Sequence, residues 1–208
     1  MPNHSCRERP REAGFSLVET MVAMCLLTFG LLGLAQVFVV GMRHLSTSAP
    51  TLIAREKARE AIESVHTARD MRVVSWSQID NTADGGIFAV GPRPLLQAGP
   101  DGLVNTADDG TGCTPALLAS PCYDAVVAPG ADGVLGTADD LRTELREFSR
   151  EIQITDLVPP SATLRQLRVI VRFSSGGAPM PAACVAGDGT PIQRPGCYVV
   201  TTYVSSYS

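Results

Sequence analysis

The feature that most constrains this chain is an uninterrupted run of uncharged residues from Thr20 to Met42. As an α-helix, with a rise of about 1.5 Å per residue, the run spans roughly 35 Å, enough to cross a hydrocarbon core of about 30 Å. A secretory signal peptide would have an apolar core of only about 7–15 residues before its cleavage site. The run therefore predicts a membrane-spanning helix, for which simple anchoring is the plainest role.

A short polar segment, residues 1–14, precedes this run and contains Arg7, Arg9 and Arg11. Positively charged residues that flank a single span favour the cytoplasmic side. We therefore expect a single-span membrane protein with a cytoplasmic N-terminus, whose remaining residues lie on the outer side of the membrane.

Glu19 is an acidic residue at the head of the apolar helix. Burying a carboxylate in a membrane costs on the order of 3 kcal/mol, so a positively charged partner is expected. Cleavage between Gly14 and Phe15 would create one, a free α-amine at Phe15. A helix cannot easily fold its first residue back onto Glu19, so the amine of a neighbouring subunit suits this pairing better. Glu19 is therefore a candidate assembly residue.

The sequence Gly14-Phe15-Ser16-Leu17-Val18-Glu19, followed by an apolar helix, resembles the class III signal of type IV prepilins and type II secretion pseudopilins. The resemblance implies that prepilin peptidase cuts between Gly14 and Phe15 and methylates Phe15, and that Glu19 sets subunit registration in a filament. It implies other pilins or pseudopilins as partners. It also implies that the chain spans the inner membrane, with its remaining residues in the periplasm or, within a filament, outside the cell. Many major pilins have a proline within the apolar segment, whereas none occurs here between Phe15 and Pro50.

Two further segments are similar to PilV-type minor pilins: REKAREAIESVHTARD, which follows the apolar helix, and the C-terminal CYVVTTYVSSYS. This resemblance implies a minor subunit of a type IV pilus. A secretion pseudopilin remains one alternative. A membrane-anchored, calcium-dependent binding domain that never polymerises is the other.

Composition argues against two other classes of function. The net charge of −4 does not provide the basic surface that nucleic-acid binding requires, so no nucleic-acid partner is predicted. The three histidines are His4, His44 and His66, all in the first third of the chain. A Ser/His/Asp or Cys/His catalytic set in the C-terminal region is therefore not expected, and we predict that the protein is not an enzyme.

The rest of the chain predicts an α+β fold, in which the long helix packs on a small antiparallel sheet with long, disulfide-pinned loops. Residues 51–70 have helical periodicity, and Pro50 predicts a kink or short break before them. One apolar stripe should face the domain: Ala54, Ala58, Ala61, Ile62, Val65 and Ala68. Arg55, Glu56, Arg59, Glu60 and Glu63 should face outward, and His66 should be half-exposed.

Strand signals cluster near the C-terminus. Leu167, Val169, Val171 and Phe173 alternate with Arg168, Ile170 and Arg172, which predicts a strand with one buried face. Phe148, Ile152 and Ile154 predict the preceding strand, with a turn at Pro159-Pro160-Ser161, and residues 198–205 predict a third strand.

The expected organisation has five parts. Residues 1–14 form a cleaved leader, residues 15–42 the membrane and filament-core helix, and residues 43–72 its amphipathic continuation. Residues 73–145 form an acidic, loop-rich insert, and residues 146–208 carry the antiparallel strands.

Six cysteines do not form three obvious pairs. Cys6 lies in the leader, and Cys25 lies in the apolar run, where a thiol acts as a small hydrophobe. The other four fall on the oxidising side and are close in sequence, which predicts the disulfides Cys113–Cys122 and Cys184–Cys197. A zinc site built from these four thiolates is the alternative. The position of the second pair resembles disulfide placement in many pilins.

An internal repeat is the other specific feature. Residues 99–109, GPDGLVNTADD, recur at residues 130–140 as GADGVLGTADD. Several carboxylates in a Gly-rich turn suit Ca²⁺, which prefers flexible oxygen ligands. A solvated turn in which Asp and Gly suit the backbone is the alternative. The candidate calcium ligands are Asp101, Asp108, Asp109, Asp132, Asp139 and Asp140.

Overall fold

The computed structural model describes residues 16–72, 74–113, 120–157, 163–175 and 177–207, without the side chains of residues 43–47. The chain forms two compact units, of which one ends at His44 and the other extends from Leu45 to Ser208. The fold is α+β, as the sequence predicts: a long N-terminal helix, antiparallel sheets and two disulfides.

Helix α1 extends from Leu17 to Asp70 and is continuous through Pro50. The break expected near residues 48–50 is therefore absent. Proline removes one N–H donor and crowds the preceding turn. The helical hydrogen bonds on either side of that turn still form, and beyond Pro50 the helix packs on the sheet. Tertiary packing supplies most of the stability of a helix in a folded protein, so it can carry one unfavourable residue.

The apolar stripe of α1 is confirmed. Its five small residues are buried, and Ile62 packs partly buried against the core. Most of the charged residues assigned to the outer face are exposed, and His66 is half-exposed. Glu60 differs, because it is only half-exposed and takes part in an ion-pair cluster.

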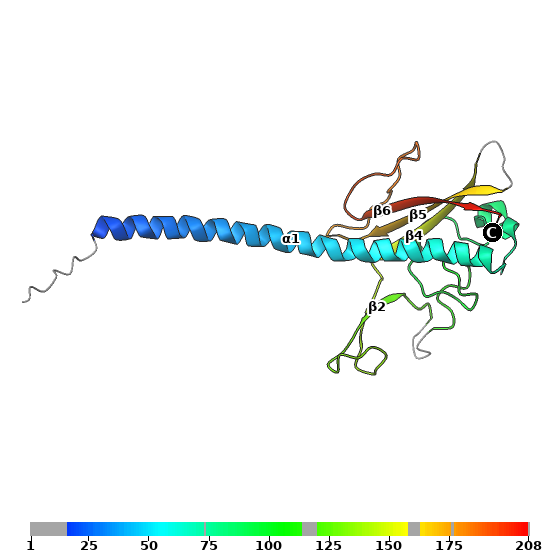
Figure 1. Cartoon of the computed structure of the whole chain (residues 1–208), viewed down its shortest axis with the longest axis horizontal. Helices are drawn as coiled ribbons and strands as arrows, with labels where there is room; N and C mark the ends of the chain where they lie inside the picture. The colour runs from blue at the N-terminus through cyan, green and yellow to red at the C-terminus, as the bar shows by residue number, and fades with distance from the viewer. Residues whose placement is uncertain (1–15, 73, 114–119, 158–162, 176, 208) are drawn as a thin grey trace, which may run out of the picture. The chain divides into compact units, whose positions relative to one another are not determined.

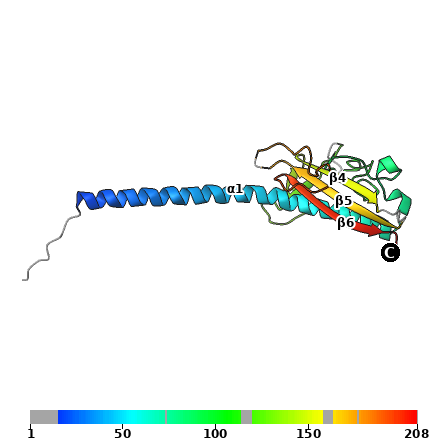
Figure 2. The ribbon, with the colours of Figure 1, turned by 90° about the horizontal axis from the view of Figure 1, so that it is seen from above.

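The main sheet has four antiparallel strands in the order β1-β4-β5-β6. Figures 1 and 2 show that β4, β5 and β6 lie along the C-terminal part of α1. In the register of these three strands, Ile152 pairs with Val169 and Val169 with Val200, which places all three side chains on the face toward the helix. The strands are β1 (Arg93–Pro94), β4 (Phe148–Asp156), β5 (Leu164–Phe173) and β6 (Cys197–Ser205).

The segment 73–145 contributes to the same core as the helix and the main sheet. Four of its side chains, Ile79, Phe88, Leu95 and Val104, are 0–2% exposed and belong to the core cluster. Because burial of large apolar side chains is the main favourable term in folding, this segment helps to stabilise the domain.

The prediction that β5 has one buried face is wrong for its second half. Leu167, Val169, Val171 and Phe173 are buried as expected, but Ile170 and Arg172 are buried as well. Arg172 forms an ion pair with Glu151 on β4 across 2.6 Å. The neighbouring Ser149 contacts Met180 from the loop that joins β5 to β6. A loop that covers the second face explains why alternation along the strand does not predict exposure.

Strands β2 (Ala125–Ala128) and β3 (Leu141–Glu144) form a separate antiparallel hairpin that the sequence did not predict. Two short 3₁₀ helices, Trp76–Gln78 and Thr82–Asp84, precede it. The predicted turn at Pro159-Pro160-Ser161 lies outside the described residues.

Both predicted disulfides are present, Cys113–Cys122 and Cys184–Cys197, with Cα–Cα distances of 5.7 and 5.5 Å. They exclude the alternative zinc site, because the thiolates that it needs are oxidised. Cys25 is a free, exposed cysteine.

Candidate functional site

The first candidate site is the apolar N-terminal part of α1. Residues Leu17–Met42 form a helical stretch of 26 residues with a mean hydropathy of 2.2, long and apolar enough to cross a membrane. Their side chains are exposed in the isolated chain. Exposing so large an apolar surface to water is unfavourable. Lipid or other protein must therefore cover it.

Glu19 lies in the first turn of this helix. The carbonyl oxygen of Ser16 accepts hydrogen bonds from the N–H groups of Glu19 and Thr20 over 3.0 and 3.2 Å. A carboxylate at a helix N-terminus interacts favourably with the helix dipole. The helix terminus therefore suits an acid, although the dipole alone offsets only part of the cost of burying a charge in lipid. The predicted cleavage site, Gly14 and Phe15, lies outside the described residues.

Two hydroxyl groups in the apolar part are satisfied within the helix. Thr20 donates to the carbonyl oxygen of Leu17 over 2.8 Å, and Thr28 donates to that of Met24 over 2.7 Å. Bonds of this kind lower the cost of placing a hydroxyl in lipid. Glu19 remains the one ionisable carboxylate of this stretch.

The second candidate site is the pair of repeated loops, which we call the first loop (residues 99–109) and the second loop (residues 130–140). In the first loop, Asp101 Oδ1 accepts a hydrogen bond from the N–H of Leu103 over 2.8 Å. Asp108 Oδ2 accepts one from the N–H of Asp101 over 3.3 Å. Asp109 Oδ2 accepts one from the N–H of Asn105 over 2.6 Å.

The second loop repeats each of these bonds at positions 31 residues later. Asp132 Oδ1 accepts from the N–H of Val134 over 2.8 Å, and Asp139 Oδ2 accepts from the N–H of Asp132 over 3.2 Å. Asp140 Oδ2 accepts from the N–H of Gly136 over 2.7 Å. The repeat in sequence is therefore a repeat in structure, in which three carboxylates hold the turn.

A threonine hydroxyl completes each loop. Thr106 donates to Asp108 over 2.8 Å, and Thr137 donates to Asp139 over 2.7 Å. Burial raises the pKa of Asp108, but the bonds from Thr106 and from the loop backbone outweigh it, so this pKa lies below its ordinary value. The Thr137 hydroxyl and the loop N–H groups lower the pKa of Asp139. Both loops therefore favour ionised carboxylates at this position.

Asp109 is in a different electrostatic environment. Burial raises the pKa of its carboxyl to about 6, although the N–H of Asn105 and the positive charge of Arg150 oppose the shift. Relative to an unfolded chain, the folded chain therefore disfavours the ionised form of Asp109.

The two loops differ in what surrounds them. Leu103 and Val104 of the first loop are 3% and 2% exposed, and the N–H of Val104 donates to Ser64 Oγ on α1 over 3.1 Å. The equivalent residues of the second loop, Val134 and Leu135, are 56% and 60% exposed. One loop is thus part of the core, and its copy projects into solvent.

Within the part of the chain that the structure describes, no group of three or more His, Cys, Asp or Glu side chains is arranged to hold a metal ion. The six candidate calcium ligands accept hydrogen bonds from N–H groups inside their own turns.

A partly buried ion-pair cluster beneath α1 was not anticipated from the sequence. Lys57 pairs with Asp124 over 2.5 Å and with Glu60 over 2.8 Å. Arg150 is 1% exposed and lies 3.4 Å from the carbonyl oxygen of Lys57. From the sequence, an arginine within a strand is ordinarily assigned to the solvent face. The burial of Arg150 becomes evident only in the structure, where α1 supplies its partners.

Residues 9–35 match the family described as "Prokaryotic N-terminal methylation motif". The match includes Gly14, Phe15 and Glu19, together with the first part of the apolar helix. Comparisons with curated proteins and with solved structures gave no match.

The chain therefore carries a type IV pilin-like or pseudopilin signal followed by an apolar helix, as expected of a membrane-anchored protein. Such a signal indicates a structural subunit that is processed by prepilin peptidase and assembles with other pilin-type proteins.

Proposed function

We propose that this protein is a minor pilin-like subunit of a type IV pilus. It is assembled through its N-terminal helix after prepilin peptidase cleaves between Gly14 and Phe15 and the new N-terminus is methylated. The observation that carries this proposal is the exposed apolar stretch Leu17–Met42 with Glu19 in its first turn, within a chain that matches the methylation motif. In the inner membrane lipid covers this surface, and in a filament the helices of neighbouring subunits cover it.

The proposed role of Glu19 follows from charge pairing. A processed neighbour presents a positively charged amine at Phe15, and the pairing removes an isolated carboxylate from an apolar environment. The span is oriented with its N-terminus in the cytoplasm, so the unit Leu45–Ser208 lies in the periplasm or on the filament surface. Its two disulfides are consistent with an oxidising compartment.

The mature N-terminus tests this proposal. Mass spectrometry of the protein purified from its native membrane should show a chain that begins with methylated Phe15. A Gly14→Asp variant should keep its leader, and a Ser16→Ala variant is the matched control that should still be cut. A native chain that retains residues 1–14 would leave a simple membrane-anchored domain and contradict the proposal.

A type II secretion pseudopilin is the alternative within the same class. It requires the same cleavage and the same Glu19, so processing does not separate the two. Co-purification separates them, because the minor pilin interpretation expects this chain in sheared surface filaments, and the pseudopilin interpretation expects it to remain in the envelope with secretion components.

Calcium binding by the two loops stays a prediction. The observation in its favour is that six carboxylates recur in two loops with the same hydrogen-bonding pattern. A non-polymerising, calcium-dependent binding domain would need both an ion in these loops and an uncut N-terminus.

A further inference from the structure

The two edges of the main sheet are protected to very different extents. At one edge lies β1, which consists of two residues, Arg93 and Pro94. A short edge strand with a charge and a proline is a common protection against pairing with another chain. At the other edge lies β6, which has nine residues and contains neither a charged residue nor a proline. Figure 2 shows β6 as the outermost of the three long strands. This strand therefore lacks the features that ordinarily keep an edge unpaired.

The register of the β5–β6 pair identifies which backbone groups of β6 point away from the sheet. At one end, the N–H of Phe173 donates to the carbonyl oxygen of Gly196 over 2.9 Å. At the other end, the N–H of Ser206 donates to that of Thr163 over 2.8 Å. Hydrogen-bonded pairs of an antiparallel ladder occur at every second residue, so the even-numbered residues of β6 bond to β5. The odd-numbered residues therefore direct their N–H and C=O groups toward the free edge.

Both ends of this free edge have partners within the chain. The N–H of Cys197 donates to the carbonyl oxygen of Arg194 over 3.3 Å. Arg69 of α1 donates to the carbonyl oxygen of Ser205, also over 3.3 Å. Between these ends, three residues have outward backbone groups without a hydrogen-bond partner in the part of the chain that the structure describes: Val199, Thr201 and Tyr203. The middle of the edge is therefore open.

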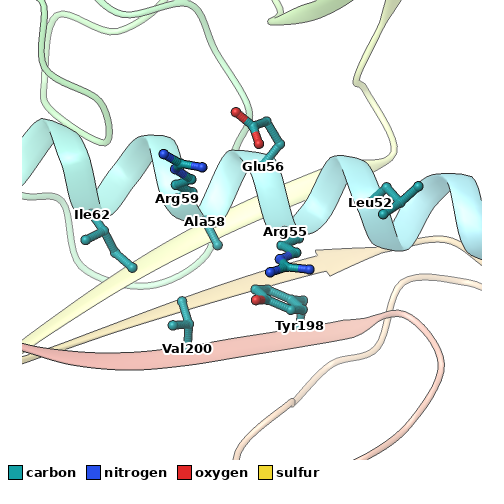
Figure 3. A pocket seen from close by; sticks show the side chains of 8 residues that line it. All are labelled: Leu52, Arg55, Glu56, Ala58, Arg59, Ile62, Tyr198 and Val200. Atoms are coloured by element: carbon teal, nitrogen blue, oxygen red, sulfur yellow. The ribbon is translucent and has the colours of Figure 1, made fainter.

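The helix-facing side of β6 borders a groove that carries no net charge. The groove lies between α1 and β6, has a volume of about 510 Å³, and is shown with its lining side chains in Figure 3. Its arginines are offset, because Arg59 pairs with Glu63 over 2.7 Å and Glu56 carries the charge opposite to that of Arg55. The apolar residues of the lining are Leu52, Ala58, Ile62 and Val200. A strand added to β6 would place alternate side chains on this side of the sheet, where uncharged side chains fit best.

A row of outward N–H and C=O groups is complementary to an extended strand that presents the same groups. We propose that an uncharged strand of a different pilin-type subunit adds to β6 beside Val199, Thr201 and Tyr203 and covers the groove. Backbone hydrogen bonds supply the affinity of such a contact, and the side chains over the groove supply its selectivity.

This inference rests on the proposed function and deepens it, because it names the contact through which the unit Leu45–Ser208 meets a neighbour. A minor subunit is surrounded by subunits of other kinds, so the added strand comes from a chain of different sequence.

Hydrogen exchange at single amides tests the proposal. The full-length chain is compared as a detergent-solubilised monomer and in sheared filaments. In the monomer, the N–H groups of Val200 and Thr202 should be protected by β5, and those of Val199, Thr201 and Tyr203 should exchange freely. In filaments, exchange at the latter three should slow about tenfold or more. Unchanged exchange at all three in filaments would overturn the proposal.

Variants at one outward residue supply the second measurement. Thr201→Pro removes an outward N–H and no bond to β5, and proline is tolerated on an edge strand in that position. Thr201→Ala, the matched control, shortens the side chain and keeps the N–H. Thr201→Pro should be cut at Gly14 like the parent chain but should reach filaments about fivefold less than Thr201→Ala. Thr201→Lys, which places a charge on the edge and keeps every backbone bond, should show the same loss if Thr201→Pro melts early in detergent.

Equal incorporation of the alanine, proline and lysine variants would overturn the strand contact. A disulfide-linked pair of differently tagged copies that carry Tyr203→Cys, with Cys6→Ser and Cys25→Ser, would place a second copy on this edge and also overturn it. The parent chain separates the two proposals. Its absence from filaments would overturn the proposed function and the strand contact with it, whereas its normal incorporation with equal variants would overturn only the strand contact.

Discussion

The backbone N–H of Val104 donates a hydrogen bond to Ser64 Oγ over 3.1 Å, and this bond ties the first loop directly to helix α1. Ser64 lies next to the fully buried Val65, so the bond forms at the edge of the core. The second loop has the same internal bonds, but its equivalent residue, Leu135, is mostly exposed. Changes at matched positions of the two loops should therefore affect the stability of the chain to very different extents.

The first prediction concerns glycine at the start of each loop. A Cβ at Gly99 would collide with the side chain and backbone of Asp108, and a Cβ at Gly130 would collide with those of Asp139. Gly99→Ala should lower the free energy of unfolding by about 1–3 kcal/mol, because the distorted loop is part of the core. Gly130→Ala, the matched control, should distort an exposed loop and change global stability by less than about 0.5 kcal/mol.

Thermal unfolding of the full-length chain in detergent measures both variants. The fluorescence of Trp76, which lies against the Arg165 guanidinium at 4.7 Å, reports on the folded domain. Equal losses of stability in the two variants would contradict the difference in burial between the loops.

A second prediction concerns Glu19 and filament assembly. Glu19→Ala should leave membrane insertion intact, because it removes a charge from an apolar helix. It should reduce incorporation into filaments about tenfold or more, because the amine of a neighbouring Phe15 loses its partner. Immunoblots of membranes and of sheared filaments measure the two quantities. Glu63→Ala, which removes an exposed carboxylate from the same helix, is the control and should assemble normally. Normal incorporation of Glu19→Ala would refute the pairing.

The third prediction concerns pH. The pKa of Asp109 in the folded chain is about 6, above its ordinary value of 3.8. Between these two values the folded chain binds more protons than the unfolded chain, so the contribution of Asp109 to stability falls as pH rises from about 4 to 6. Asp109→Asn should remove this contribution. The stability of the variant minus that of the parent chain should therefore be larger at pH 7 than at pH 4.

Melting temperatures of the full-length chain at pH 4 and pH 7, in the presence of a chelator, measure this effect. Asp140→Asn in the second loop is the matched control, since it removes the equivalent loop carboxylate from the exposed copy. An identical difference between Asp109→Asn and the parent chain at both pH values would count against the assigned pKa.

The fourth prediction concerns the disulfide Cys184–Cys197, which closes the loop leading into β6. Replacing both cysteines with serine should lower the free energy of unfolding by about 2–4 kcal/mol, because the unfolded chain regains the freedom of that loop. It should also increase hydrogen exchange at the start of β6, where Cys197 pairs with Arg172. The prediction is wrong if the double-serine variant is as stable as the oxidised parent chain, or if reduction leaves the stability of the parent chain unchanged.

The calcium prediction leads to a titration. If the repeated loops bind Ca²⁺, isothermal titration should show two ions for each full-length chain, and saturation should raise the melting temperature. Asp139→Asn should remove one of the two ions and Asp108→Asn the other, and Asp188→Asn, which changes an Asp outside the loops, should remove neither. No heat and no stabilisation would reject calcium and leave the loops as turns held by their own hydrogen bonds.

Patterns with short periods were predicted well. The apolar run, the stripe at Ala54, Ala58 and Ala61, and the alternation at Leu167 and Val169 each depend on neighbours within a few residues, so the sequence contains them directly. The two disulfides followed from sequence proximity and compartment. The continuous helix at Pro50 was not predicted, because packing of the following residues on the sheet outweighs a local preference.

By itself, the sequence determined the long apolar N-terminal helix, the methylation motif and the existence of two similar loops, since these reside in local composition and order. Only the tertiary structure decided that Arg150 is buried beneath α1, that Arg172 lies under a covering loop, and that one loop enters the core while its copy projects from a hairpin. The physical reason is that burial depends on which distant segment covers a residue. Two loops with nearly the same sequence therefore fold alike and still occupy opposite environments.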